Sequence, residues 1–134
     1  MPFPSMSSKG TTMPTDNPHA LPQVVADHVA ACNDHDLTAL MATFAADAFV
    51  NDAGREFIDR SAIQAWVDAE IIAPKVTMQV TDAVMRKSNV ILHAKVDGAF
   101  DKTGLPDPLI LTYHFNVADG RIDQLVITLH KQAL

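Results

Sequence analysis

Hydrophobic side chains recur every three or four residues in two stretches near the start of the chain, and this spacing predicts two short helices. The first helix is expected over residues 21–33, with one face formed by Leu21, Val25, His28 and Cys32. The second is expected over residues 37–46, with Asp36 as its N-cap and an apolar stripe of Leu37, Leu40, Met41 and Phe44. Residues 48–51 then have the pattern of a short strand, which ends at Asp52, Ala53 and Gly54.

A third helix is predicted between residue 59 and Pro74. Either Asp59 or Ser61 would begin it, and Gln64 stands three residues after Ser61 as a capping-box partner. One stripe of this helix carries Ile63, Trp66, Val67, Glu70 and Ile71, and Pro74 would end it.

Beyond Pro74, apolar and polar residues alternate, which is the pattern of half-buried strands. Four strands are expected, over residues 76–81, 90–97, 109–117 and 122–130, and Asp119-Gly120 is a strong hairpin signal. Three helices followed by sequential antiparallel strands predict an α+β domain, in which one curved sheet wraps on the helices.

Length and composition allow one such domain. The chain has 134 residues, of which 48% are hydrophobic, enough for one core but not for two. Residues 1–18 hold four of the eight prolines and show no periodicity, so we expect a disordered tail ahead of a single domain over residues 19–134.

The charge balance argues against two classes of partner. Ten Lys and Arg against sixteen Asp and Glu give a net charge of -6, which repels nucleic acid and anionic lipid surfaces. No apolar run approaches the roughly 18 residues of a membrane span, and the start of the chain lacks the pattern of a secretory signal. With one cysteine, Cys32, no internal disulfide can form. We therefore expect a cytoplasmic protein with a free thiol.

The strand over residues 90–97 predicts a partner subunit. It is apolar on one face, at Val90, Leu92, Ala94 and Val96, while the other face also holds Ile91. Because the helices can cover only one side of the sheet, a second copy of the chain is expected to cover the other. We predict a homodimer through the face with Leu92, and outward positions for His114 and His130.

Two strings, NDHDLTALMATFAADAFVND and HFNVADGRIDQLVI, resemble sequences of the nuclear transport factor 2-like superfamily. The resemblance is strongest to the SnoaL-like polyketide cyclases and ketosteroid isomerases, and it covers residues 21–132. It implies a cone-shaped α+β barrel with an apolar pocket, which the first helix, the first strand, the third helix and the concave sheet face would line.

The resemblance also implies site residues. Asp52 falls where ketosteroid isomerases carry their proton-shuttling aspartate, and His28 falls at their oxyanion-binding tyrosine. Their second oxyanion donor would correspond to Tyr113, or to Thr112 under a different loop length. The pocket wall would include Phe44, Trp66, His93, Lys95, Asp97, Phe115, Leu125 and Ile127.

A weaker resemblance connects Lys95-Val96-Asp97 to the Arg-X-Asp of limonene epoxide hydrolases. The second acid of those enzymes would correspond to Ile127, so the proton-donating half of that mechanism has no carrier in this chain.

Each site residue also has a structural interpretation. Asp52 could close its own turn, and His28 could be a core histidine bonded to a carbonyl. The face with His93, Lys95 and Asp97 could be solvated. His28, Cys32 and His35 could suggest a metal site, but His35 lies beyond the expected helix end and no HExxH motif is present.

Two hypotheses about function follow. In the first, a dimeric, cofactor-independent enzyme transfers a proton on an apolar carbonyl compound, with Asp52 as the base and with His28 and Tyr113 as hydrogen-bond donors to the oxyanion. In the second, the cone binds a hydrophobic ligand or a protein without catalysis.

Overall fold

The computed structural model describes residues 21–130, so the tail predicted over residues 1–18 lies outside the described residues. The chain order of its elements is α1 (Gln23–Asn33), α2 (Leu37–Ala42), β1 (Phe44–Asp52), β2 (Arg55–Phe57), α3 (Arg60–Val67), the π-helical turn η1 (Asp68–Ile72), β3 (Thr77–Arg86), β4 (Asn89–Asp97), β5 (Ile110–Ala118) and β6 (Arg121–Leu129). This order confirms the predicted α+β class.

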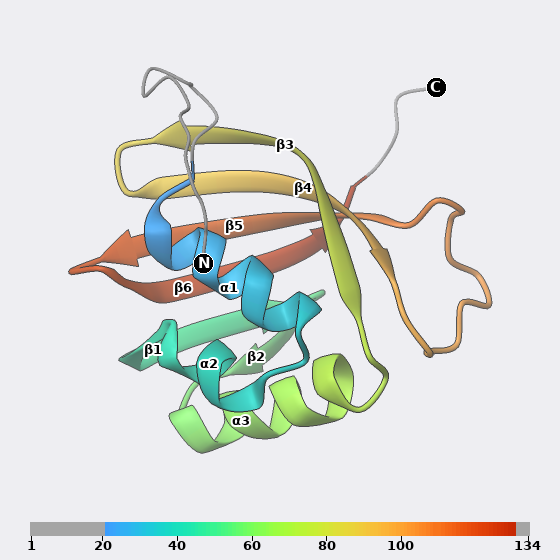
Figure 1. The fold of residues 1–134 in the computed structure, drawn as a ribbon, viewed down its shortest axis with the longest axis horizontal. Coiled ribbons are helices and arrows are strands. Elements are labelled where there is room, and N and C mark those ends of the chain that lie inside the picture. Colours follow the sequence, from blue (N-terminus) through green and yellow to red (C-terminus); the bar gives the residue numbers. More distant parts are fainter. Residues whose placement is uncertain (1–20, 131–134) are drawn as a thin grey trace.

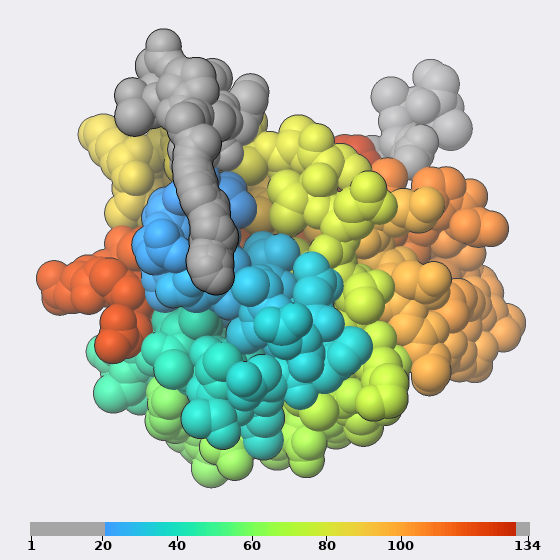
Figure 2. Space-filling model, viewed as in Figure 1, coloured from blue at the N-terminus to red at the C-terminus, as the bar shows by residue number. Residues whose placement is uncertain are grey.

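The six strands form one curved sheet in the order β2-β1-β6-β5-β4-β3. Neighbouring strands are antiparallel, except that β1 and β6 run parallel. Helix α1 crosses the inner face of the sheet, while α3 lies against β1 and β2 (Figure 1). From the helix side, α1 and α2 cover the middle of the molecule (Figure 2). The large side chains buried between these layers include Leu40, Ile63, Leu92, Phe115, Ile122 and Leu125.

Several elements follow from local sequence. Asp36 caps α2 by accepting a hydrogen bond from Ala39 N at 3.0 Å. Asp59, rather than Ser61, caps α3, because its carboxylate accepts from Ala62 N at 2.8 Å and from the Ser61 hydroxyl at 2.9 Å. These hydrogen bonds hold the pKa of Asp59 below its ordinary value.

The hairpin between β5 and β6 confirms the turn predicted at Asp119-Gly120. Both residues have positive φ angles, 53° and 74°, as a two-residue type I′ turn requires. This turn and a register shift between Asn116 and Val117 together place Tyr113 opposite Ile127.

Helix α2 is shorter than predicted. It ends at Ala42 rather than at residue 46, and the chain continues as β1 from Phe44. Phe44 pairs with Ile122 of β6, and Ile122 N donates to Thr43 O at 2.9 Å. Phe44 has the spacing of the apolar stripe of α2, but it forms a strand because it pairs with β6, which is distant in sequence.

Strand β3 is longer than predicted, and β2 was not predicted. The alternation in β3 breaks at a bulge between Val80 and Asp82, beyond which the strand continues to Arg86 opposite Asn89. Strand β2 has three residues and pairs with β1 at the edge of the sheet.

The predicted facing of β4 was wrong. Val90, Leu92, Ala94 and Val96 point into the core, and Leu92 is 0% exposed. His93, Lys95 and Asp97 therefore lie on the outer face. An alternating pattern identifies two faces but does not say which of them the helices cover, and here they cover the more uniformly apolar one. The homodimer prediction loses the residues on which it was based.

Candidate functional site

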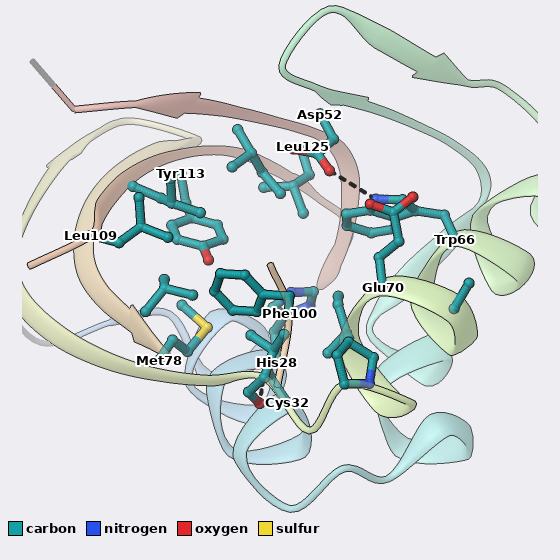
Figure 3. A pocket seen from close by; sticks show the side chains of 17 residues that line it. His28, Cys32, Asp52, Trp66, Glu70, Met78, Phe100, Leu109, Tyr113 and Leu125 are labelled. Carbon is teal, nitrogen blue, oxygen red and sulfur yellow. Dashed lines mark hydrogen bonds between the residues drawn. The ribbon is translucent and has the colours of Figure 1, made fainter. Parts of the chain in front are cut away.

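A cavity of about 360 Å³ lies between the inner face of the sheet and the helices, and η1 and the loop after β4 contribute to its wall. Its wall is mostly apolar. The ionisable side chains on it are His28, Cys32, Asp52, Glu70 and Tyr113. Figure 3 shows these side chains around one open space.

Asp52 is placed on this wall by the end of β1. Its Oδ2 accepts hydrogen bonds from Trp66 Nε1 at 3.0 Å and from Arg55 Nη2 at 2.7 Å. The turn after β1 is closed by the neighbouring side chain, because Gly54 N donates to Asn51 Oδ1 at 2.9 Å. Asp52 is therefore not the turn-closing residue. Its Oδ1 has no hydrogen-bond partner within residues 21–130.

Arg55 links Asp52 to Glu70. Its two terminal nitrogens contact the two carboxylate oxygens of Glu70, each at 2.7 Å, and this bidentate pair raises the pKa of Arg55. The side chains of Arg55 and Glu70 are 52% and 40% exposed, so the pair lies where the cavity meets solvent. The guanidinium is thereby shared between two carboxylates.

His28 projects from α1 and is only 2% exposed. Its Nδ1 lies 3.0 Å from Thr43 Oγ1, and the Thr43 hydroxyl donates its proton to Leu40 O at 2.7 Å. Because a hydroxyl has one proton, Nδ1 must carry the hydrogen that joins it to Thr43, which leaves Nε2 with a lone pair. Burial lowers the pKa of His28 to about 4, so the ring is neutral at neutral pH.

This assignment corrects the expected role of His28. A neutral ring with its hydrogen on Nδ1 cannot donate from Nε2 to an oxyanion; it can only accept there. Phe44 and Phe115 hold the ring by edge contacts, with centroids 5.4 and 5.2 Å from it. These two residues, expected on the pocket wall, instead pack behind His28.

Tyr113 projects from β5 and is 7% exposed. Its hydroxyl points into the cavity (Figure 3) and has no hydrogen-bond partner among the described residues. Burial raises the pKa of this phenol, with smaller contributions from Cys32 and Asp52, so it keeps its proton. Thr112 faces the other side of the sheet, and Tyr113 is the residue of the two that reaches the cavity.

Cys32 lies on the cavity wall beside His28. Its thiol is 3.9 Å from Val76 O, and burial raises the pKa of Cys32 to about 11. The thiol is therefore protonated at neutral pH and is a poor nucleophile.

The remaining predicted wall residues divide into two groups. Trp66, Leu125 and Ile127 line the cavity. His93, Lys95 and Asp97 lie outside it, which follows from the facing of β4 and corrects their expected placement in the cone. On the outer face, His93 forms a 3.0 Å hydrogen bond with Asp82 and its ring contacts the ring of His130. Asp97 forms an ion pair with Lys102 at 3.3 Å.

Sequence reasoning missed wall residues that come from the loop after β4 and from β3. Phe100 points into the cavity (Figure 3), and Ala99 N donates to Pro74 O at 2.7 Å, which anchors the loop beneath it. A lone aromatic residue in a loop rich in Gly, Asp and Pro was the only available signal. Met78 and Leu109 complete this side.

The structure contains no grouping of three or more His, Cys, Asp and Glu within residues 21–130 that could hold a metal ion. His35, one member of the metal site considered above, instead contacts Val76 O at 2.9 Å. Among the same residues, no helix has the length and apolar character needed to cross a membrane.

Comparison with known proteins establishes the family. The SnoaL-like domain family matches residues 25–125, and the chain belongs to that family. No curated protein matches the chain.

Solved structures agree with this assignment. A candidate polyketide cyclase from Sinorhizobium meliloti is 33% identical, with a TM-score of 0.72 over 81% of this chain and 95% of that one. A candidate ketosteroid isomerase from Kribbella flavida shares the fold at 9% identity, with a TM-score of 0.68 over 84% and 79%. A candidate polyketide cyclase from Pseudomonas putida does so at 19% identity, with a TM-score of 0.64 over 81% and 90%. The nuclear transport factor 2-like fold is thus confirmed.

Proposed function

We propose that the cavity is the active site of a cofactor-independent enzyme that transfers a proton on a small, apolar, carbonyl-bearing substrate, as an isomerase, cyclase or dehydratase does. One observation carries the proposal: a carboxylate, Asp52, and a neutral phenol, Tyr113, face the same largely apolar cavity. A base and a hydrogen-bond donor on opposite sides of a substrate are what enolisation needs.

The chemistry uses both groups in one step. The substrate carbonyl accepts a hydrogen bond from the Tyr113 hydroxyl, while Asp52 Oδ1 removes a proton from the adjacent carbon. The C–H electron pair forms the enolate double bond, and negative charge develops on the oxygen that Tyr113 contacts. Asp52 then returns the proton to another carbon, or the enolate carbon attacks an electrophile within the same substrate.

Trp66 and Arg55 act as positioning residues in this scheme. Both donate to Asp52 Oδ2, which fixes the carboxylate and leaves Oδ1 available to the substrate. Glu70 engages both terminal nitrogens of Arg55 and thereby limits how far the guanidinium turns toward Asp52.

The second candidate function is ligand binding without catalysis. The observation that favours it is that Asp52 already contacts Trp66 and Arg55. These contacts would explain the presence of Asp52 at this position by a structural role alone. The two functions differ in whether a bound ketone exchanges its protons.

The test is deuterium exchange at the carbon next to the carbonyl of enolisable ketones, such as 1-tetralone, followed by NMR in D2O. Asp52→Asn should lower catalysed exchange by about a hundredfold or more, because positioned general bases contribute at least that much. Asp47→Asn is the matched control, since Asp47 is an exposed residue of the same strand. Ketones that bind but exchange no faster than in buffer would favour the binding function.

A second copy of the chain stays the predicted partner, through a different surface from the one first expected. The outer sheet face carries Val84, which is 47% exposed, beside Ile91, and Val126 lies two strands further along the same row. The helices lie on the inner side, so this face is where a partner would pack.

A further inference from the structure

Two buried side chains that line the cavity, His28 and Tyr113, each keep one polar atom without a hydrogen-bond partner among residues 21–130, and the two atoms are of opposite character. His28 Nε2 is a hydrogen-bond acceptor, and the Tyr113 hydroxyl is a donor. We propose that the cavity selects ligands that carry both a hydroxyl group and a carbonyl group on an apolar ring skeleton, with the hydroxyl donating to His28 Nε2 and the carbonyl accepting from Tyr113. The carbonyl half of this inference rests on the proposed function; the hydroxyl half is independent of it.

The acceptor character of Nε2 is built into the fold. Thr43 ends α2, and its hydroxyl proton is committed to Leu40 O, so the Thr43 oxygen can only accept from His28 Nδ1. The edges of Phe44 and Phe115 restrict rotation of the ring. Nε2 therefore presents a lone pair and cannot exchange roles with Nδ1 without breaking this chain of hydrogen bonds.

Buried polar groups are nearly always hydrogen-bonded, so an unpartnered acceptor on a cavity wall indicates the group that it meets in the complex. A lone pair attracts a hydroxyl hydrogen and repels an ether, carbonyl or carboxylate oxygen at the same point. The site therefore distinguishes a free hydroxyl from its methyl ether, which differs only by the missing donor and one added carbon.

The rest of the wall defines the skeleton. Met78, Phe100, Leu109, Leu125 and Ile127 present apolar surface on the wall of the same cavity. A volume of about 360 Å³ is at the small end of the range of roughly 300–1,000 Å³ typical of ligand pockets. Fused-ring ketones of the size of a tetralone match both properties.

The experiment compares three kinds of probe on the full chain by calorimetry: 1-tetralone, its 5-, 6- and 7-hydroxy derivatives, and the matching methyl ethers. At least one hydroxytetralone should bind about tenfold more tightly than its own methyl ether. His28→Phe should remove this difference, because it keeps an aromatic ring against Phe44 and Phe115 but has no acceptor. Asp27→Asn is the control, since Asp27 is an exposed residue of the same helix and lies off the cavity wall.

A second measurement does not depend on the variant folding. NMR of the histidine ring nitrogens in the unaltered protein should show His28 Nε2 without a hydrogen, and its resonance should shift on addition of a hydroxytetralone but not of the ether. A hydrogen on Nε2 in the free protein would overturn the inference. So would equal affinities for every hydroxytetralone and its ether.

The two proposals fail separately. Selectivity for the hydroxyl without deuterium exchange supports this inference and contradicts proton transfer. Exchange of 1-tetralone without any preference for hydroxytetralones supports proton transfer and overturns this inference.

Discussion

The indole nitrogen of Trp66 donates a 3.0 Å hydrogen bond to Asp52 Oδ2, which joins α3 to the end of β1 at the cavity wall. The two residues are 14 positions apart in sequence, and neither local pattern requires the contact. The hydrogen bond orients the carboxylate, so Trp66 is more than part of an apolar wall.

Trp66→Phe tests this positioning role. The variant keeps an aromatic ring but loses the donor, and we expect kcat for ketone exchange to fall about tenfold with little change in KM. Loss of one hydrogen bond to a charged group should cost about 1.5–3 kcal/mol of stability. Exchange kinetics and urea unfolding measure the two effects. An unchanged kcat would show that Trp66 does not orient the reacting carboxylate.

Glu70 should matter more for activity than for stability. Its ion pair with Arg55 is largely solvent-exposed, so Glu70→Gln should lower the free energy of unfolding by no more than about 1 kcal/mol. The released guanidinium can then turn both nitrogens toward Asp52, and catalysed exchange should fall severalfold. Arg55→Leu should also lower exchange, because Asp52 then loses a donor that fixes its carboxylate. Unchanged exchange in Glu70→Gln would contradict this role for Glu70.

Protonation of His28 should make stability depend on pH. Burial lowers its pKa from 6.5 to about 4, so the unfolded chain binds this proton more readily than the folded protein does. The stability that neutral His28 contributes is complete above pH 6.5 and is lost as the pH falls toward 4. A shift of this size corresponds to a loss on the order of 3 kcal/mol across that window.

Urea unfolding between pH 7 and pH 4 measures this dependence. His28→Phe should flatten the curve in that window. The lowered pKa values of Asp59 and Asp82 act in a separate window, below their ordinary value of 3.8. Equal slopes for the unaltered protein and His28→Phe would show that His28 does not control this window.

Adjacent residues of β4 should respond differently to substitution. Leu92 is fully buried, so Leu92→Ala should cost about 2–5 kcal/mol in urea unfolding. Ile91 lies on the outer face, and in a dimer that packs through this face Ile91→Lys would place one charge on each side of the symmetric contact. We expect a monomer by light scattering, with the fold retained. A dimer that survives Ile91→Lys would exclude this face as the interface.

Phe100 should contribute to ligand binding with little effect on the fold. It is half-buried in the loop after β4 and points into the cavity. Phe100→Ala should weaken tetralone binding about tenfold through lost apolar contact. Leu105→Ala in the same loop is the control, because Leu105 is exposed and lies off the cavity wall. If calorimetry gives Phe100→Ala and the unaltered protein the same affinity for tetralone, the ligand does not contact Phe100.

The sequence by itself determined the features that depend on near neighbours. Helix α1, the Asp36 cap and the Asp119-Gly120 turn each follow from residues within one or two turns of chain, because hydrogen-bond geometry and φ preferences are local. The resemblance of two short strings to a known superfamily also predicted the fold. It directed attention to His28, Asp52 and Tyr113, which line one cavity.

Only the tertiary structure decided which face of each strand is covered and which distant side chains meet. The alternation in β4 is equally compatible with Leu92 inward and Leu92 outward, and the position of the helices chose between them. In the same way, Thr43, 15 residues away in sequence, determines which ring nitrogen of His28 carries the hydrogen. Arg55 contacts Glu70, which is also 15 residues away. These contacts depend on how separate elements pack, and no periodicity within one element records that packing.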